Sequence, residues 1–331
     1  DHHHPIVPPE DRLPVDPSTD VPEGYRPADR GRPGGFAADP DVFDTWATSS
    51  LTPQIAGGWE SDPELFGLVF PYSLRSQGQD IIRTWLHYTM LRCVQLTGKM
   101  PWGEAWIMGY GVDEKGEKMS KSKGNVINPM EIVSAYGSDA LRLGIIAKRS
   151  AGQNQAFSTA SVVAGRNFCN KLWNMARFIE PHIGEHTGDR PEPKTIADHW
   201  VIARLEAART AVETHLEGYR FAEASDTVYH TVWNDVADWY LEASKLQPNP
   251  SVLAWVLETS LKLAHPFAPF VTEAIWTTLE RHETLLISQQ WPGKTAFNDI
   301  AAAEFTQIQS LVTEARFVAS DLPGGKQKLV Y

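Results

Sequence analysis

The sequence predicts an α/β segment followed by an all-α helical bundle. Proline and glycine are concentrated in the first 40 of the 331 residues, which predicts an irregular start. Short apolar segments then alternate with helical patterns as far as about residue 157. From about residue 158 onward, apolar side chains recur almost wholly at helical spacing. With 42% apolar residues, the chain is long enough for two domains that each bury a core.

Residues 1–40 are predicted to form an extended connector. They hold nine of the 23 prolines and four glycines, a composition that sustains neither a helix nor a central strand. We therefore expect the chain to begin within a longer protein.

The first part of the α/β segment is predicted to contain two strands and one helix. A short apolar segment at residues 68–74 suits a strand, and residues 80–96 have helical periodicity. A second strand is predicted at residues 105–112, because the turn composition Asp-Glu-Lys-Gly follows it at residues 113–116.

Two short helices are predicted to end the α/β segment. Asn128 followed by Pro129 is a typical helix start, and Gly137 is a typical helix end. Ser138 is then expected to cap the next helix.

The bundle is predicted from four long helical runs separated by proline, glycine or asparagine. Pro266 and Pro269 should end one helix and begin another inside the last run. A further helix is expected at about residues 301–319, with a strand starting at Lys328. The four runs cover residues 160–180, 195–217, 221–246 and 251–282.

Composition and charge exclude several classes of protein. No apolar stretch reaches the 18 or so residues that a membrane span needs, so we expect a cytoplasmic protein. Two cysteines, Cys93 and Cys169, exclude a disulfide framework and a thiolate-rich zinc site, and we expect no bound metal. The net charge of −11 disfavours nucleic acid, yet residues 142–177 hold six basic and no acidic residues. On charge alone, an RNA-binding face and a helix face paired with acids from elsewhere are equally good interpretations.

The strongest chemical signal is a loop rich in lysine and serine. Residues 118–122 read Lys-Met-Ser-Lys-Ser, and residues 123–125 read Lys-Gly-Asn. Three lysines within six residues form a cationic strip suited to a polyphosphate, although a solvated surface loop is the alternative.

The full pentapeptide resembles the signature loop of the class I aminoacyl-tRNA synthetases. The resemblance implies the second half of a Rossmann-type catalytic domain, at residues 41–157, that also includes the region contacting the tRNA stem. Its substrates would be an amino acid and ATP with Mg²⁺, with no other cofactor. The loop would stabilise the pyrophosphate electrostatically as an aminoacyl-adenylate forms. The residues implied are Lys118, Lys121, Ser120 and Ser122 as catalytic groups and Met119 as an ATP contact.

Two segments resemble the valine enzymes of this class. Residues 41–46 end in Asp-Thr-Trp, which places Trp46 as a wall of the amino acid pocket. Residues 78–82, Gly-Gln-Asp-Ile-Ile, would place Ile81 in the same pocket, although core packing is the alternative for both. The lysine after the pentapeptide, Lys123, also matches the valine form. By the same resemblance, the adenylate contacts would be Asp80, Gly78, Ile107, Met108 and Gly109.

Residues 158–290 resemble the anticodon-binding bundle of the same enzymes, and residues 291–331 would begin a C-terminal extension. The partner implied is tRNA(Val), bound by a monomer. Unpaired bases are recognised by stacking and by hydrogen bonds to their edges. The tRNA contacts implied are Lys171, Phe178, Arg166, Leu241 and Glu242.

The sequence also departs from the family pattern. The His-Ile-Gly-His motif of the first half is absent, and we interpret the similar residues 182–186 as coincidence. No inserted editing domain is present either, so we expect this chain alone not to aminoacylate tRNA. Three alternatives stay open: an isoleucine or leucine enzyme, a non-catalytic tRNA-binding module, and a small nucleotidyltransferase.

Overall fold

The computed structural model describes residues 4–39, 44–113, 115–120, 123–147, 152–281 and 283–320. The chain divides into two compact units. The first unit comprises Asp1–Arg75 and Asp80–Ala105, and the second comprises Ser76–Gln79 and Trp106–Tyr331. The end of the α/β segment expected at residue 157 falls inside the second unit.

The described part of the N-terminal connector, residues 4–39, contains no α-helix and no regular strand, as predicted. Its regular elements are two single 3₁₀ turns, η1 (Glu10–Arg12) and η2 (Pro27–Asp29). Phe36 is buried here because Tyr25 packs edge-on against its ring at 5.4 Å and the Arg30 guanidinium lies 4.7 Å from the ring centre.

Three short helices come before the first strand. They are α1 (Thr45–Ser49), α2 (Thr52–Ala56) and α3 (Pro63–Val69), and β1 follows at Tyr72–Gly78. The strand predicted at residues 68–74 exists as β1, but its predicted start is wrong, because β1 begins four residues later at Tyr72. Asp62 accepts a hydrogen bond from the Leu65 amide at 3.0 Å and Pro63 occupies the first helical position, so residues 68 and 69 continue a capped helix.

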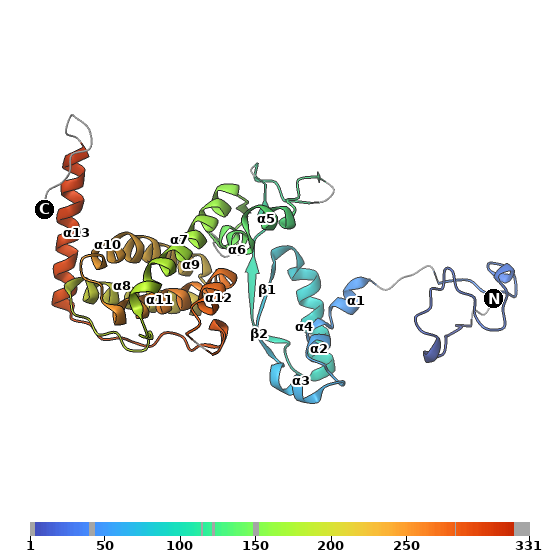
Figure 1. Cartoon of the computed structure of the whole chain (residues 1–331). Helices are drawn as coiled ribbons and strands as arrows, with labels where there is room; N and C mark the ends of the chain where they lie inside the picture. The colour runs from blue at the N-terminus through green and yellow to red at the C-terminus, as the bar shows by residue number, and fades with distance from the viewer. Residues whose placement is uncertain are drawn as a thin grey trace. The chain divides into compact units, whose positions relative to one another are not determined.

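The predicted helix at residues 80–96 exists, but it begins with unusual turns. A 3₁₀ turn, η3 (Gln79–Ile81), leads into a π-helical segment, η4 (Ile82–Leu86), and then into α4 (His87–Thr97). Gly98 ends α4 with a φ of 71°. β2 (Trp102–Met108) then pairs with β1 in a two-stranded sheet (Figure 1).

The predicted strand at residues 105–112 is divided in two. β2 ends at Met108, and β3 (Gly111–Val112) pairs in parallel with β4 (Gln155–Ala156). Both predicted helices are confirmed as α5 (Pro129–Tyr136) and α6 (Ser138–Ile146). The Asn128 cap accepts from the Met130 amide at 3.0 Å, whereas Ser138 is the first helical residue and Gly137 takes the cap position.

The rest of the second unit is a helical bundle, as predicted (Figure 1). Pro266 lies between α11 and α12, and Pro269 is the first residue of α12. The strand expected from Lys328 lies outside the described residues. Within the described ranges, no helix combines the length and the apolar character that crossing a bilayer requires. The elements are α7 (Thr159–Ile183), α8 (Ile196–Glu217), α9 (Phe221–His230), the π-helical η6 (Thr231–Tyr240), α10 (Leu241–Ser244), α11 (Pro250–Ala264), α12 (Pro269–Thr278), η7 (Leu286–Ser288) and α13 (Asp299–Ser320).

The bundle core includes one fully engaged carboxylate. Asp198, only 1% exposed, accepts hydrogen bonds at 2.8 Å from the Tyr240 hydroxyl and from the Asn249 amide. Its second oxygen also accepts from the backbone amides of Lys194 and Thr195. Burial and the neighbouring Asp198 raise the pKa of Tyr240. A buried charge is tolerated in this core because each oxygen has partners.

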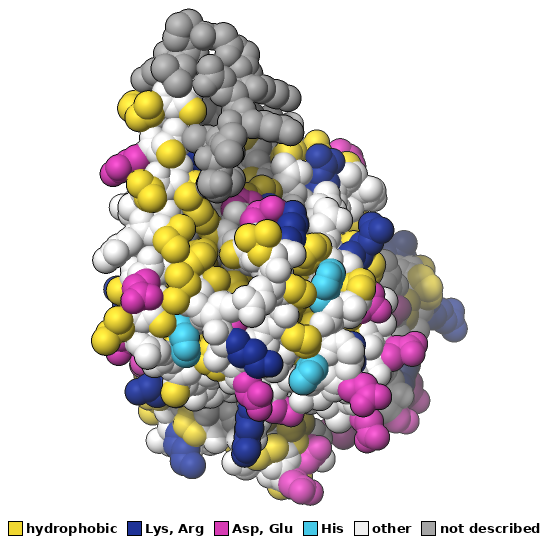
Figure 2. Space-filling model, turned by 60° about the vertical axis from the view of Figure 1, so that its left-hand side comes forward, with side chains coloured by type: hydrophobic (Ala, Val, Ile, Leu, Met, Phe, Trp, Pro, Cys, Tyr) yellow, Lys and Arg dark blue, Asp and Glu magenta, His cyan; other side chains and the backbone are white. Residues whose placement is uncertain are grey.

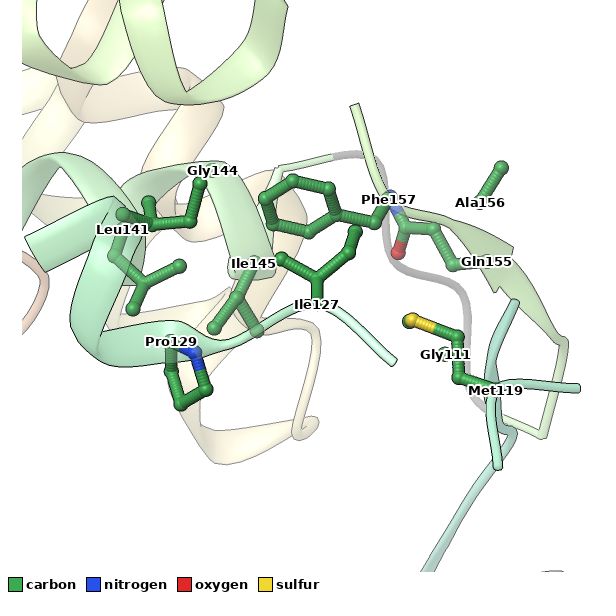
Figure 3. A pocket seen from close by; sticks show the side chains of 11 residues that line it. Gly111, Met119, Ile127, Pro129, Leu141, Gly144, Ile145, Gln155, Ala156 and Phe157 are labelled. Atoms are coloured by element: carbon green, nitrogen blue, oxygen red, sulfur yellow. The ribbon is translucent and has the colours of Figure 1, made fainter. Parts of the chain in front are cut away.

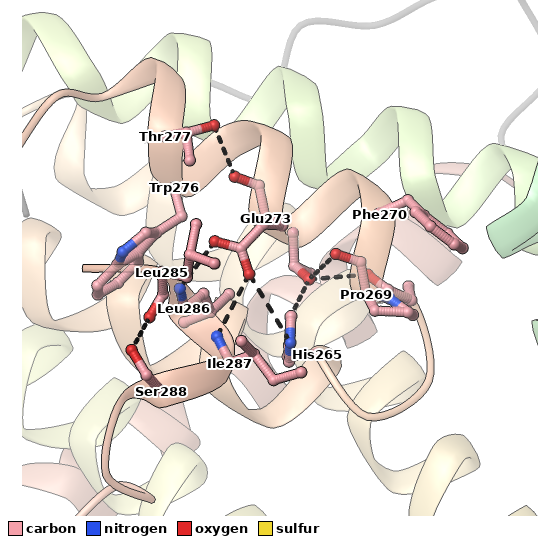
Figure 4. Close-up of polar contacts among 12 residues, drawn as sticks. His265, Pro269, Phe270, Glu273, Trp276, Thr277, Leu285, Leu286, Ile287 and Ser288 are labelled. Atoms are coloured by element: carbon pink, nitrogen blue, oxygen red, sulfur yellow. Dashed lines mark hydrogen bonds and ion pairs between the residues drawn. The ribbon is translucent and has the colours of Figure 1, made fainter.

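Polar contacts fix the bend between α11 and α12 (Figure 4). Glu273 accepts from the backbone amides of Leu286 at 2.8 Å and Ile287 at 3.3 Å, and its carboxylate lies 4.0 Å from His265 Nε2. His265 Nδ1 lies 2.8 Å from the Thr272 hydroxyl. Burial lowers the pKa of His265, an effect that the Glu273 carboxylate opposes.

The last helix, α13, is buried on one side only. Its Phe305 packs against Trp200 of α8 with ring centres 5.0 Å apart. Figure 2 is turned so that the side of the molecule with α13 comes forward, and hydrophobic side chains gather on this face. The exposed apolar residues of α13 are Ile300, Ile308, Leu311, Phe317 and Val318.

Candidate functional site

The lysine-rich loop begins as an extended segment beside β3. Lys118 bridges Val112 in antiparallel fashion, and its ammonium lies 3.9 Å from the centre of the Tyr110 ring. This distance is within the range of a cation–π interaction, which holds the charge near the strand. Two of the predicted catalytic residues, Lys121 and Ser122, lie outside the described residues.

Asn125 holds the described ends of the loop together. Its side-chain oxygen accepts from the Ser120 amide at 2.9 Å, and its side-chain nitrogen donates to Asp113 at 2.9 Å. The hydrogen bond from Asn125 is the largest cause of the lowered pKa of Asp113. Lys123 pairs with Glu117 at 3.3 Å across the same turn. The loop is therefore tied to the strand that precedes it.

An apolar pocket of about 210 Å³ lies beside this loop (Figure 3). Met119 lines it from the loop side, opposite Leu141 and Ile145 of α6. A methionine in such a pocket positions the loop because its flexible thioether fills irregular apolar space. The full lining is Gly111, Met119, Ile127, Pro129, Ile132, Leu141, Gly144, Ile145, Gln155, Ala156 and Phe157.

In the predicted adenine-facing segment, Ile107 and Met108 end β2 and Gly109 follows the strand, and all three residues are half-buried. At Gly109 an added Cβ would overlap the backbone of Gln153, so only glycine fits without a shift. The neighbouring Asn154 side chain accepts from the Tyr110 amide at 2.9 Å. Gly78 lies at the end of β1, also in the second unit.

The candidate amino acid pocket belongs to the first unit. Trp46 is half-buried on α1, where Asp44 accepts from its backbone amide at 3.0 Å. Ile81 is half-buried immediately before η4, the element on which α1 packs, and Asp80 is exposed beside it. Trp85 of η4 donates to the Ser49 carbonyl at 3.0 Å, which fixes α1 against this segment.

The predicted tRNA contacts lie on α7 and on the short helix α10. The Lys171 ammonium pairs with Asp238 at 2.7 Å and lies 4.9 Å from the Trp233 ring centre. Phe178 is half-buried, and the Lys245 ammonium lies 5.8 Å from its ring centre. Lys245 in turn pairs with the predicted contact Glu242 at 2.6 Å.

Two predicted tRNA contacts have other surroundings. Leu241 is only 5% exposed and packs in the bundle core, so an RNA base cannot reach its side chain in this structure. The Arg166 guanidinium lies 5.5 Å from the Tyr136 ring of α5. Arg142, from the same basic stretch, donates to the Pro266 and Phe267 carbonyls, which is a structural role.

The sequence interpretation gave no contact role to Tyr110, Asn125, Trp233 and Lys245. The contacts of Lys171 with Trp233 and of Lys245 with Phe178 depend on folding, so no local signal marks them. Lys245 and Glu242, by contrast, have i,i+3 spacing on a helix, a local signal that could have indicated their ion pair. Among the described residues, no three His, Cys, Asp or Glu side chains are grouped as a metal site requires.

Two family models match the chain in the order of the two predicted parts. The model described as tRNA synthetases class I (I, L, M and V) matches residues 28–158. The model described as the anticodon-binding domain of tRNA ligase matches residues 198–323. The chain belongs to the class I tRNA synthetases.

The similar proteins agree with this membership of the class I synthetases. The valine–tRNA ligase of Salinispora arenicola is 41% identical over 315 residues, which cover 89% of this chain and 35% of the relative. That of Thermobifida fusca is 41% identical over 324 residues, covering 94% of this chain and 36% of the relative. The chain thus spans about a third of the length of these relatives.

Solved class I synthetases show the same fold. The LeuRS of Agrobacterium radiobacter, solved as a ternary complex with tRNA and LeuAMS, gives a TM-score of 0.67 at 23% identity. The match covers 81% of this chain and 35% of LeuRS. The methionyl-tRNA synthetase of Mycobacterium tuberculosis, bound to methionyl-adenylate, gives 0.59 at 22% identity, covering 72% of this chain and 50% of that one. The predicted class, a catalytic half-domain followed by an anticodon-binding bundle, is confirmed.

Proposed function

We propose that this chain serves valine–tRNA ligation, supplying the pyrophosphate-stabilising loop, part of the valine pocket and the tRNA(Val)-binding bundle. The observation that carries the proposal is that one chain matches the catalytic and the anticodon-binding family models in order, with valine–tRNA ligases as relatives. The isoleucine or leucine alternative is not favoured by these relatives.

The loop would act on the phosphates of ATP. When the valine carboxylate attacks the α-phosphorus, negative charge moves onto the departing pyrophosphate, which ammonium groups stabilise electrostatically. Among the described residues, Lys118 is our candidate for this step, and two features support it: its backbone bridges to Val112 of β3, and its side chain is exposed. Mg²⁺ would arrive with ATP as part of the substrate. The attacking carboxylate is already an anion, so no general base is required.

The valine pocket would use Trp46 and Ile81. Both side chains are half-buried and belong to the first unit. Trp46 lies on α1, which packs on η4, and Ile81 immediately precedes η4. An indole facing a β-branched chain leaves a small apolar space suited to an isopropyl group. Pocket shape would then set the preference for valine over larger aliphatic amino acids.

A chimera tests the catalytic role. Residues 44–320 would replace the matching part of the Thermobifida fusca ligase, and valine-dependent ATP–pyrophosphate exchange would be measured. Lys118→Ala should lower kcat by roughly 100-fold or more, the usual cost of losing one transition-state donor. Lys115→Ala is the matched control, because Lys115 is an exposed lysine of the same turn outside the pentapeptide. Equal activity of the two variants would refute the role of Lys118.

The same chimera tests the amino acid pocket. Trp46→Leu should raise the exchange rate with isoleucine relative to valine, because a smaller wall admits one more methylene. An unchanged preference would instead favour an isoleucine or leucine pocket. A chimera without exchange that still binds tRNA(Val) would favour the non-catalytic module.

A further inference from the structure

The end of α7 presents two aromatic rings in contact. Phe178 and His182 are four residues apart, so they share one face of the helix. Their ring centres are 5.1 Å apart with an angle of 30° between the planes. Phe178 packs partly against the bundle core, whereas His182 is exposed. The half-buried Phe178 ring therefore anchors the pair, and the imidazole of His182 is its more exposed member.

A hydrogen bond restrains the imidazole. His182 Nδ1 lies 2.8 Å from the backbone carbonyl of Phe178. A carbonyl only accepts, so Nδ1 carries the hydrogen, and in the neutral ring Nε2 is left as an acceptor. The ring thus has a defined orientation, which lowers the entropy cost of binding a flat partner.

Two lysines near the pair already have acidic partners. The Lys245 ammonium near the Phe178 ring is paired with Glu242, and about two helical turns away along α7 Lys171, near Trp233, is paired with Asp238. Paired charges attract phosphates weakly, so these two lysines offer RNA little through electrostatics alone. Stacking on aromatic rings is a further source of affinity for unpaired bases.

We propose that His182 and Phe178 together form a two-ring platform on which an unpaired base of the anticodon loop stacks, with the imidazole in direct contact with the base. This inference rests on the proposed tRNA-binding function. It gives His182 a binding role that the sequence interpretation, which treated residues 182–186 as coincidence, did not assign.

The test measures binding of the whole chain to a tRNA(Val) anticodon stem-loop RNA by fluorescence anisotropy at fixed ionic strength. His182→Ala should weaken binding about tenfold, within the range found for loss of one stacking ring. His182→Phe keeps a ring and should bind within about twofold of the unchanged chain, since stacking needs only the π-face. His230→Ala is the matched control, because His230 is an exposed histidine of α9, paired with Asp226, outside the platform.

A further variant separates stacking from a purely structural role. His182→Asn can still donate to the Phe178 carbonyl but has no ring, so it should bind as weakly as His182→Ala. Binding retained in His182→Asn and lost in His182→Phe would overturn the inference in favour of a helix-end hydrogen bond. Circular dichroism should show the same helix content in all variants.

Direct stacking gives a second readout. With 2-aminopurine in place of an anticodon adenine, the unchanged chain should quench the fluorescence and His182→Ala should quench it less. Equal quenching by both would overturn the inference. If the unchanged chain binds the stem-loop no better than a loop of scrambled sequence, the proposed function fails. If Phe178→Ala weakens binding and His182→Ala does not, the inference about His182 alone fails.

Discussion

Helices α11 and α4 contain similar proportions of apolar residues but have opposite surroundings. Of the 15 residues of α11, 13 are buried, including polar residues such as Thr259. Of the 11 residues of α4, only Thr89 and Cys93 are buried. Tyr88, Leu91 and Val94 of α4 are between 41% and 48% exposed.

This contrast indicates which part of the chain contributes most to the free energy of unfolding. Burial of apolar area drives folding, and within the described chain α11 is surrounded by the other bundle helices while α4 packs on α1, α2 and η4. The bundle therefore stabilises itself, whereas the α/β layer contributes much less. Three predictions test this contrast, in order of decreasing effect.

The largest effect is expected from a core leucine. Leu257→Ala in α11 should lower the free energy of unfolding by about 2–5 kcal/mol, because it removes a buried side chain and leaves a cavity. Leu91→Ala in α4 should change it by no more than about 0.5 kcal/mol, as for ordinary surface positions. Urea denaturation followed by circular dichroism measures both. Comparable losses for the two variants would break the contrast.

A smaller effect is expected at the contact between α6 and the bundle. Asp139, 6% exposed, accepts from the backbone amides of Phe270 at 3.3 Å and Val271 at 2.6 Å, which begin α12. Asp139→Ala should cost about 1–3 kcal/mol because two amides lose their acceptor. In the same denaturation assay, Asp139→Asn keeps one acceptor oxygen and should cost less. No loss in either variant would mean that α6 is not coupled to the bundle.

The smallest effect concerns cysteine labelling of the folded protein. Burial, with the charge of Asp139, raises the pKa of Cys169 to about 12, and burial raises the pKa of Cys93. Only the thiolate reacts, so near neutral pH labelling by a thiol reagent should speed up about tenfold per pH unit. Cys93 is less exposed than Cys169 but should react first, because the thin layer around α4 opens more readily than the bundle.

Peptide mass spectrometry at successive times measures the two labelling rates, with Cys93→Ser as a single-thiol control. Faster labelling of Cys169 would show that the bundle opens more easily and would reverse the contrast.

Local signals predicted much of the fold. Asn128 with Pro129, and Pro266 with Pro269, set helix ends through capping and missing amide donors, which act within a few residues. The misplaced first strand also had a local signal, the Asp62–Pro63 helix start, which an apolar pattern alone overlooked. The π-helical turns had no such signal.

The candidate site was only partly predictable. The pentapeptide at residues 118–122 could be recognised directly in the sequence. The contact of Lys118 with Tyr110 could not, because it depends on how the loop folds back along β3. For the adjacent residues Leu241 and Glu242, the phase of the helix determines which side chain is accessible to RNA. One residue turns a helix by about 100°, so Leu241 points into the core and Glu242 points toward solvent. A family position does not by itself fix that phase.

The ten-residue π-helical segment η6 has a consequence for variation in chain length. Its wide turns hold an extra residue, so deleting one residue there would let the segment tighten into an ordinary α-helix without breaking. The side chains on either side of the deletion would then keep nearly the same phase, because the wide turn had absorbed the deleted residue. Lys245 could stay over Phe178 while Trp233 kept its place beside Lys171. A deletion within an ordinary α-helix such as α7 would instead rotate one flank by about 100° relative to the other and separate such pairs.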